Sequence, residues 1–163
     1  MGEQNFTEYN SKLIYAISGC GKSSLSTLMP EIIDGDQFLY STLESYMPKL
    51  NPRLRVRRWK QLCRIQKPNH DQEKMKREIR AHYVEQFCEA LSKRNSVIVT
   101  SIFDLPFSYD LYIGYEIGQY IPHLLGTGRI IDNDQSEEDN LNLKNFTPLL
   151  RLEKDTFLNL EHF

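Results

Sequence analysis

The pattern of apolar and polar positions divides the chain into short buried strands and amphipathic helices. Residues 12–17 (KLIYAI) form an apolar run that ends at a Ser-Gly pair, which is typical of a buried parallel strand leading into a loop. The segment from Lys22 to Pro30 is compatible with a short helix, and residues 31–34 (EIID) with a brief second strand. Strand, glycine-rich loop, helix and strand in this order predict a parallel βαβ unit.

Three helices are expected in the middle of the chain. Residues 37–47 are followed by two prolines, and the basic stretch 53–67 is compatible with a second helix. The most regular pattern spans residues 70–94, with Asn69 and Gln72 as a candidate capping box. Apolar side chains recur there every four positions: Met75, Ile79, Tyr83, Phe87 and Leu91.

The last third of the chain has weaker patterns. Ser96–Ser101 (SVIVTS) is a near-continuous apolar run and the best candidate for a central strand. Residues 107–125 fit either a helix or a strand. We expect a short strand at 129–132, an exposed acidic loop at 134–140 and a helix at 149–160.

The composition predicts a single globular domain in an intracellular setting. The 163 residues are 40% hydrophobic and 26% charged, and we find neither a repeat nor a linker. Residues 1–163 are therefore predicted to be a single domain with an inserted helical segment at about 37–94. The three cysteines form no disulfide or zinc pattern and favour a reducing compartment. No apolar run approaches the ~20 residues that span a bilayer, so we expect a cytoplasmic protein without a membrane partner.

Charge is distributed unevenly, although the net charge is only −2. Residues 53–80 hold eleven Lys and Arg against three acids, whereas residues 131–163 hold three against eight. One interpretation of this asymmetry is a basic side that faces an anion, such as a nucleic acid. The other is two solvated faces whose charges partly neutralise each other across the fold.

The clearest motif lies at residues 16–23 (AISGCGKS). It matches the phosphate-binding pattern G-x-x-x-x-G-K-[ST] at every fixed position except the first, where Ala16 replaces glycine. Glycines allow successive N–H groups to face a phosphate. Lys22 is placed to bridge β- and γ-phosphates, and the Ser23 hydroxyl to bind Mg²⁺. The expected nucleotide-binding residues are Ser18, Gly19, Cys20, Gly21, Lys22, Ser23 and Ser24.

This stretch resembles the P-loop NTPase superfamily, and SGCGKSS in particular resembles its small kinases. The resemblance covers roughly residues 12–38. It implies an α/β fold of three layers (αβα) around a parallel sheet, with ATP and Mg²⁺ as cofactors.

Asp34 and Asp36 form the second motif, IIDGDQF. Ligands of open α/β sheets bind beyond the carboxyl ends of the strands, so both carboxylates should lie beside the phosphate pocket. The stretch resembles the DxD motif of gluconate and shikimate kinases, with Asp34 toward the metal and either acid as the base. The alternative is a polar turn in which Asp36 caps a helix.

Arginines are candidates for holding the acceptor and the transferring phosphate. Arg53, Arg57 and Arg58 lie where such kinases insert the segment that binds the acceptor. A lid arginine would have to be Arg129 or Arg151.

Three other residues leave alternatives open. Trp59 and Tyr46 would either stack on a base or pack within the protein. Asp104 is a reserve candidate for substrate or metal contact, because the strand at Ser96–Ser101 does not end in an acid.

The sequence thus predicts a P-loop kinase that transfers the γ-phosphoryl group of ATP to a nucleotide or another small anionic metabolite. The alternatives are a P-loop NTPase that acts with nucleic acid, through the basic segment 53–80, or with a protein, and a relative that binds nucleotide without chemistry.

Overall fold

A five-stranded parallel sheet forms the centre of the molecule. The computed structural model describes residues 11–93, 95–128 and 133–163. The strand order is β2-β3-β1-β4-β5, and all four neighbouring pairs are parallel. The strands are β1 (Lys12–Ala16), β2 (Ile32–Asp34), β3 (Val97–Thr100), β4 (Leu111–Tyr115) and β5 (Leu149–Leu152). The predicted α/β fold with a parallel sheet is confirmed, but the middle strand is β1, with β3 beside it.

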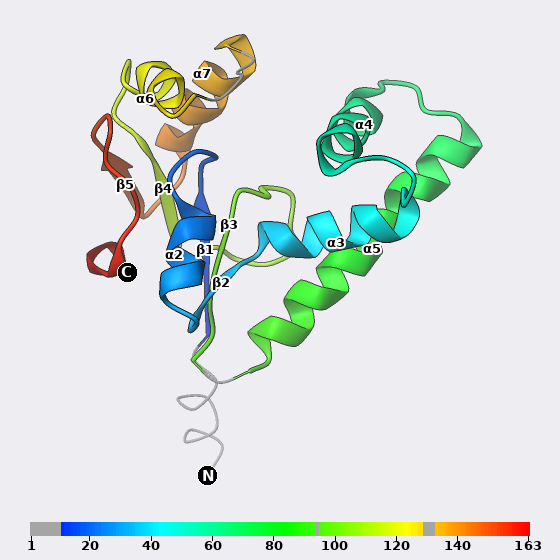
Figure 1. Cartoon of the computed structure of the whole chain (residues 1–163), viewed down its shortest axis with the longest axis horizontal. Coiled ribbons are helices and arrows are strands. Elements are labelled where there is room, and N and C mark those ends of the chain that lie inside the picture. Colours follow the sequence, from blue (N-terminus) through cyan, green and yellow to red (C-terminus); the bar gives the residue numbers. More distant parts are fainter. Residues whose placement is uncertain (1–10, 94, 129–132) are drawn as a thin grey trace.

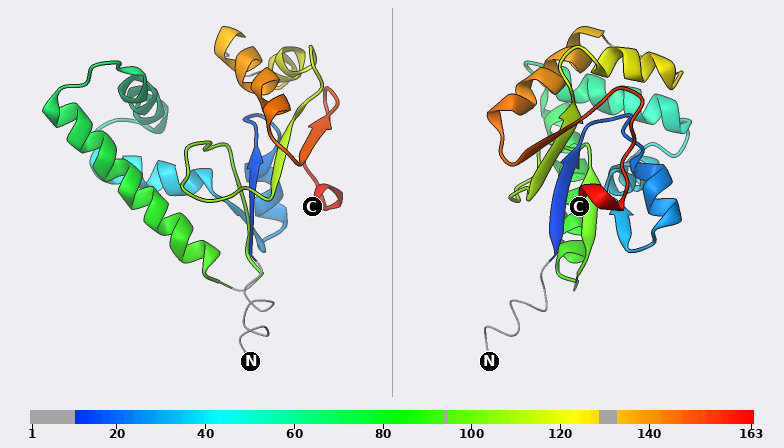
Figure 2. Two further views of the ribbon diagram at one scale, coloured as in Figure 1. Left: turned by 180° about the vertical axis from the view of Figure 1, so that it is seen from behind. Right: turned by 90° about the vertical axis from the view of Figure 1, so that its left-hand side faces the viewer.

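Helices connect β1 to β2, β2 to β3 and β4 to β5, whereas an irregular segment connects β3 to β4. The helices are α2 (Lys22–Leu28), α3 (Asp36–Tyr46), α4 (Pro52–Arg64), α5 (His70–Leu91), α6 (Tyr120–Gly126) and α7 (Asn133–Asn142), with short 3-10 turns η1 (Leu143–Asn145) and η2 (Leu160–His162). Helices α3, α4 and α5 follow one another between β2 and β3 and project from one side of the sheet (Figure 1). In the right-hand view of Figure 2 they lie behind the sheet. They correspond to the helical segment expected at about 37–94.

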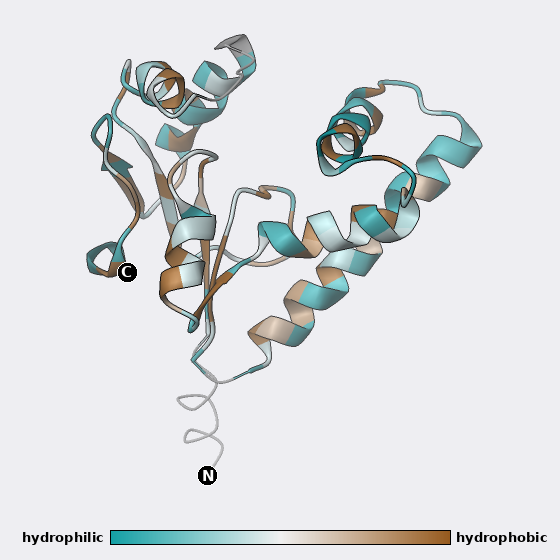
Figure 3. Cartoon of the chain, viewed as in Figure 1, coloured by the Kyte–Doolittle hydropathy of each residue, from teal (hydrophilic) through white to brown (hydrophobic). Residues whose placement is uncertain are grey.

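The alternation of side chains along β1 and β3 sorts the core into two layers. Leu13 and Ile98, which are partners in the β1–β3 register, pack with apolar side chains of α3, α4 and α5. Ile14 and Val99, the next pair, pack with side chains of α2 and α6. Helices therefore cover both faces, and the apolar residues concentrate on the strands and on the inward helix faces (Figure 3).

Helix starts follow local sequence signals. The Asn69 side chain and Gln72 form the expected capping box of α5. Helix α3 begins directly after Gly35, where a β-carbon would lie 2.7 Å from Cε1 of the buried Phe87 ring. Glycine is required there because β2 turns into α3 against α5, and this turn places Asp36 at the edge of the sheet.

The expectation of an exposed acidic loop at 134–140 is wrong, because these residues belong to helix α7. Asn140 is buried and makes two hydrogen bonds with the backbone of Tyr115 in β4, at 2.8 Å and 3.1 Å. This contact lies between residues distant in sequence, and the acidic composition of the segment gives no sign of it.

The helix expected at 149–160 is also wrong. Leu149–Leu152 form β5, which pairs with β4 at the edge of the sheet, and an irregular segment leads to η2. A short apolar run fits either element, and here the free edge of β4 decides between them. Residues 107–125 contain both β4 and α6. The strand expected at 129–132 lies outside the described residues.

Candidate functional site

The loop between β1 and α2 turns at two glycines. Gly19 and Gly21 have φ angles of 91° and 93°, in the left-handed region that favours glycine. Among the described residues, the N–H groups of Cys20 and Lys22 face the Cys20 thiol, and no other acceptor is found for the backbone N–H groups from Ser18 to Ser24. The remaining N–H groups are therefore available to a ligand.

Lys22, the first residue of α2, is buried with 7% of its surface exposed. Its Nζ lies 3.6 Å from Oδ2 of Asp36 and 3.4 Å from the carbonyl oxygen of Ile17. A lysine this buried needs polar partners, and its ammonium group is held at the edge of the sheet by an anion and a carbonyl. It therefore lies beside the loop, as the motif requires.

Ser23 and Asp34 bring two oxygen groups together. The Ser23 hydroxyl donates a 2.9 Å hydrogen bond to Oδ2 of Asp34, and Oδ1 of Asp34 accepts from the backbone N–H of Asp36 at 3.1 Å. A carboxylate can accept about four hydrogen bonds, so Asp34 keeps capacity for a further partner.

Asp36 is more completely bonded. Its Oδ1 accepts from the Thr100 hydroxyl at 2.7 Å and from the Ser101 N–H at 2.8 Å. Its Oδ2 accepts from the Ser101 hydroxyl at 2.8 Å and faces Lys22. The cap of α3 is Gly35, and Asp36 makes no side-chain cap hydrogen bond. This carboxylate thus links the ends of β2 and β3 to Lys22 at the start of α2.

Thr100 and Ser101 were not predicted as site residues. The sequence indicated only that the strand at Ser96–Ser101 does not end in an acid. The signal that could have identified them is a pair of hydroxyl residues at the carboxyl end of a buried strand, because such ends meet at one edge of a parallel sheet.

A cavity of about 120 Å³ opens at this edge. Its lining residues are Ser18, Gly19, Gly21, Lys22, Ser23, Ser24, Asp34, Asp36 and Tyr40. The sequence predicted all of these except Tyr40. The remaining predicted loop residue, Cys20, has none of its surface exposed, and burial raises the pKa of its thiol.

The cavity lies at the topological switch point of the sheet. The chain leaves β1 toward β2 on one side, whereas it leaves β3 toward β4 on the other. Ligands of open α/β sheets bind where the connections diverge in this way.

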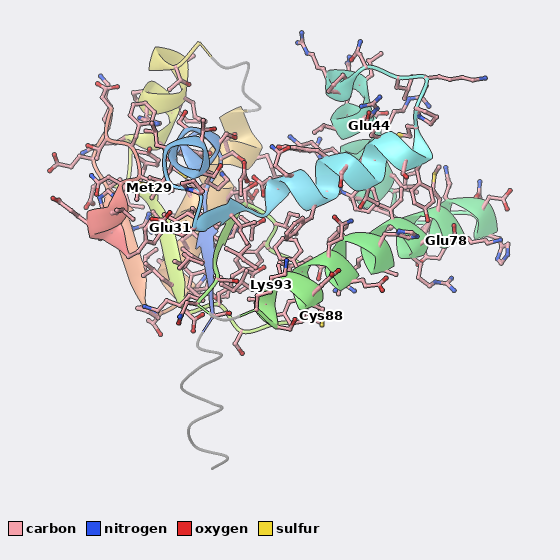
Figure 4. The ribbon with its side chains drawn as sticks, turned by 60° about the horizontal axis from the view of Figure 1, so that its bottom comes forward. Met29, Glu31, Glu44, Glu78, Cys88 and Lys93 are labelled. Carbon is pink, nitrogen blue, oxygen red and sulfur yellow. The ribbon has the colours of Figure 1, made fainter. Side chains whose placement is uncertain are left out.

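A larger cavity of about 450 Å³ lies between α3 and α4. Tyr40 lines both cavities. The larger one carries Arg53 and Arg55 from the first turns of α4 opposite Glu44 of α3, which is labelled in Figure 4. Its remaining lining residues are Gln37, Ser41, Leu43, Pro52 and Val56. The cavity therefore combines an apolar wall with groups of both charges.

The structure separates the predicted arginines. Arg53 lines the larger cavity, whereas the described residues that line either cavity do not include Arg57, Arg58 or Arg151. Arg57 and Arg58 are exposed on α4. Arg151, on β5, donates to the Tyr115 carbonyl at 2.7 Å, which is a contact within the sheet region. Arg129 lies outside the described residues.

The two aromatic candidates pack within the protein. Trp59 is buried edge-on against Tyr83, and Tyr46 lies edge-on to His82. Asp104, the reserve candidate, is exposed and pairs with Arg80 at 3.3 Å.

The residues at the cavity fit a magnesium ion that shares its coordination with phosphate and water. Within the described ranges, no three His, Cys, Asp or Glu side chains are grouped to hold a metal by themselves. Ser23 and Asp34 supply oxygen ligands, and Mg²⁺ typically takes only one or two protein ligands beside substrate phosphates.

Comparisons with protein-family models, with curated proteins and with solved structures found no match. In the part of the chain that the structure describes, no helix is both long and apolar enough to cross a membrane.

Proposed function

We propose that this protein is a P-loop kinase that transfers the γ-phosphoryl group of ATP to a small anionic acceptor, such as a nucleotide or another metabolite. The observation that carries the proposal is the arrangement around the smaller cavity. Residues of the β1–α2 loop line it together with Lys22, Ser23, Asp34 and Asp36, and Ser23 and Lys22 contact Asp34 and Asp36, respectively. This is the arrangement expected of a phosphate-binding loop facing a DxD pair.

Each group has a role in phosphoryl transfer. The loop amides and Lys22 bind the β- and γ-phosphates, and Ser23 and Asp34 would hold a Mg²⁺ ion, which would supply neutralisation of the phosphate charge. When Lys22 turns to the phosphates it leaves Oδ2 of Asp36, which then has a free lone pair. An acceptor hydroxyl can give its proton to that oxygen while its own oxygen attacks the γ-phosphorus. The bond to the β-phosphate breaks and ADP leaves.

The larger cavity is the candidate acceptor site. It shares the lining residue Tyr40 with the smaller cavity. An acceptor bound beside Tyr40 would therefore lie near the γ-phosphate of a nucleotide in the smaller cavity. Arg53 and Arg55 suit a phosphate or carboxylate group, while Leu43 and Val56 suit an apolar body.

A second candidate function is an NTPase that acts with nucleic acid. The exposed Arg57 and Arg58 on α4 favour it, because they lie outside both cavities and can contact a phosphate backbone.

The test measures Mg²⁺-dependent ATP binding by calorimetry and then incubates labelled ATP separately with nucleoside monophosphates, small polyols and oligonucleotides. A kinase forms a labelled product with one acceptor. ATP hydrolysis that rises only with oligonucleotide, without labelled product, would support the second function. Absence of Mg²⁺-dependent binding by folded protein would exclude both.

A further inference from the structure

Three carbonyl groups of the phosphate loop are held from outside the cavity. Those of Ser18, Gly19 and Cys20 accept hydrogen bonds from the Tyr120 hydroxyl, the His123 imidazole and the Leu158 N–H, respectively. The C=O and the following N–H of a trans peptide point in opposite directions. Holding the carbonyls on one side therefore turns the following amides toward the other side, where the cavity lies.

His123 is the most constrained of these donors. It has none of its surface exposed, and its ring stacks on Tyr115 with centroids 4.2 Å apart. Its Nδ1 lies 2.9 Å from the backbone N of Asp155, which can only donate, so Nδ1 accepts and the proton is on Nε2. Nε2 then donates to the Gly19 carbonyl at 2.8 Å. The tautomer of His123 is thus set by the chain that follows β5.

That chain also contacts the loop directly. The N–H of Leu158 donates to the Cys20 carbonyl at 2.8 Å, and the Phe157 ring lies 5.0 Å from the His123 ring. A β-carbon on Gly21 would lie 3.4 Å from Phe157, which is ordinary packing distance. Helix α6 and residues 155–158 together support the loop on the side away from the cavity.

We propose that His123 is a positioning residue that orients the amides of the phosphate loop for a triphosphate by holding the Gly19 carbonyl. This inference rests on the proposed function of the loop. The competing explanation is a core histidine whose hydrogen bonds serve only folding, so the test has to separate nucleotide affinity from stability.

Three substitutions of His123 each keep a different part of its contacts. His123→Gln places an amide nitrogen near the position of Nε2 and can keep the Gly19 bond. His123→Asn can keep only the bond from the Asp155 N–H, and His123→Phe keeps only the packing on Tyr115. His82→Gln, on the exposed surface of α5, is the matched control.

Calorimetry at a temperature where every variant is folded gives the dissociation constant for ATP. We expect up to about a tenfold weaker affinity for the Asn and Phe variants, the effect of one hydrogen bond, with the Gln variant closer to wild type and His82→Gln unchanged. Equal affinity in all His123 variants, with only their melting temperatures lowered, would overturn the inference. Should the His123 variants fail to fold, Tyr120→Phe removes the hydroxyl bond to Ser18 and is expected to weaken ATP binding in the same way; unchanged affinity there counts against the proposal.

Nitrogen-15 NMR of the wild-type histidines supplies a second readout. A protonated Nε2 with a bare Nδ1 at neutral pH supports the assignment, and the opposite tautomer contradicts it. A wild-type protein that binds neither ATP nor inorganic pyrophosphate would overturn the proposed function together with this inference. ATP binding that is insensitive to His123 would overturn the inference alone.

Discussion

The Ser23 hydroxyl donates a 2.9 Å hydrogen bond to Asp34, across the edge of the sheet between the start of α2 and the end of β2. Strands β1 and β2 are not neighbours, since β3 lies between them. The two side chains meet because parallel strands all end at the same edge. This pair places a neutral and an anionic oxygen beside the amides of the β1–α2 loop.

Replacing Lys22 should remove phosphoryl transfer but not the fold. Lys22→Ala is expected to lower turnover at least about a hundredfold, because the cation that stabilises the charge on the phosphates is lost. Asp36 keeps its bonds from Thr100 and Ser101, so circular dichroism should be unchanged. Lys74→Ala, an exposed lysine on α5, is the control. Wild-type turnover in folded Lys22→Ala protein would rule out the mechanism.

The two aspartates should differ in their effect on stability. Asp36→Asn places an amide NH₂ group among donors that surround a buried carboxylate, which should lower the free energy of unfolding by about 1–3 kcal/mol. Asp34→Asn disturbs fewer hydrogen-bond donors than Asp36→Asn does. It should therefore chiefly weaken the response of activity to Mg²⁺. Urea unfolding and a magnesium titration measure the two effects. An equal loss of stability in both variants would contradict the assignment.

Arg53 should affect the acceptor more than the arginines of α4 that lie outside both cavities. Arg53→Ala is expected to raise the KM for the acceptor with little change in the KM for ATP, because Arg53 lines only the larger cavity. Arg58→Ala, also exposed on α4 but outside both cavities, is the matched control. If Arg58→Ala raised the acceptor KM as much as Arg53→Ala, the acceptor would have to bind elsewhere.

A side chain at Gly35 should lower the stability of the fold. In Gly35→Ala the new methyl group would lie 2.7 Å from Phe87 and 3.0 Å from Ile98, and relieving such overpacking typically costs about 1–3 kcal/mol of stability. Gly126→Ala is the control, since its β-carbon would lie 3.4 Å from Asp155, which is an ordinary contact. Thermal melting compares them. A Gly35→Ala protein as stable as wild type would show that α5 can move away from the β2–α3 turn.

Cys20 and Cys88 should differ in their rate of alkylation. The thiolate is the reactive form, and burial raises the pKa of the Cys20 thiol, so its thiolate fraction at pH 8 is smaller than that of an ordinary thiol. Cys88 is exposed on α5, as labelled in Figure 4. Iodoacetamide at pH 8 should therefore modify Cys88 in the native protein and Cys20 only in urea, as mass spectrometry would detect. Rapid native modification of Cys20 would mean that the phosphate loop opens readily.

Local sequence signals predicted the first half of the fold well. The glycine spacing around Lys22, the apolar run before it and the Asn69 cap depend on neighbouring residues, and each predicted element there exists. The cavity lining followed from the same signals, because the loop and the Asp34–Asp36 pair come within one βαβ unit.

The remaining features depend on contacts between distant segments. Asn140 fixes α7 on β4, and β5 forms because β4 offers an edge, so neither element was predicted correctly. The contact of His123 with Gly19 in the loop spans 104 residues, and the contact of Ser101 with Asp36 spans 65. No periodicity or spacing in the sequence marks such pairs.

The burial of Trp59 gives this protein an internal optical probe. It is the single tryptophan of the chain, and it lies on α4 against Tyr83 of α5, next to residues that line the larger cavity. Indole emission shifts to longer wavelength when water reaches the ring. Movement of α4 on occupation of the cavity would therefore change the intrinsic fluorescence, and titrations could be followed without a label.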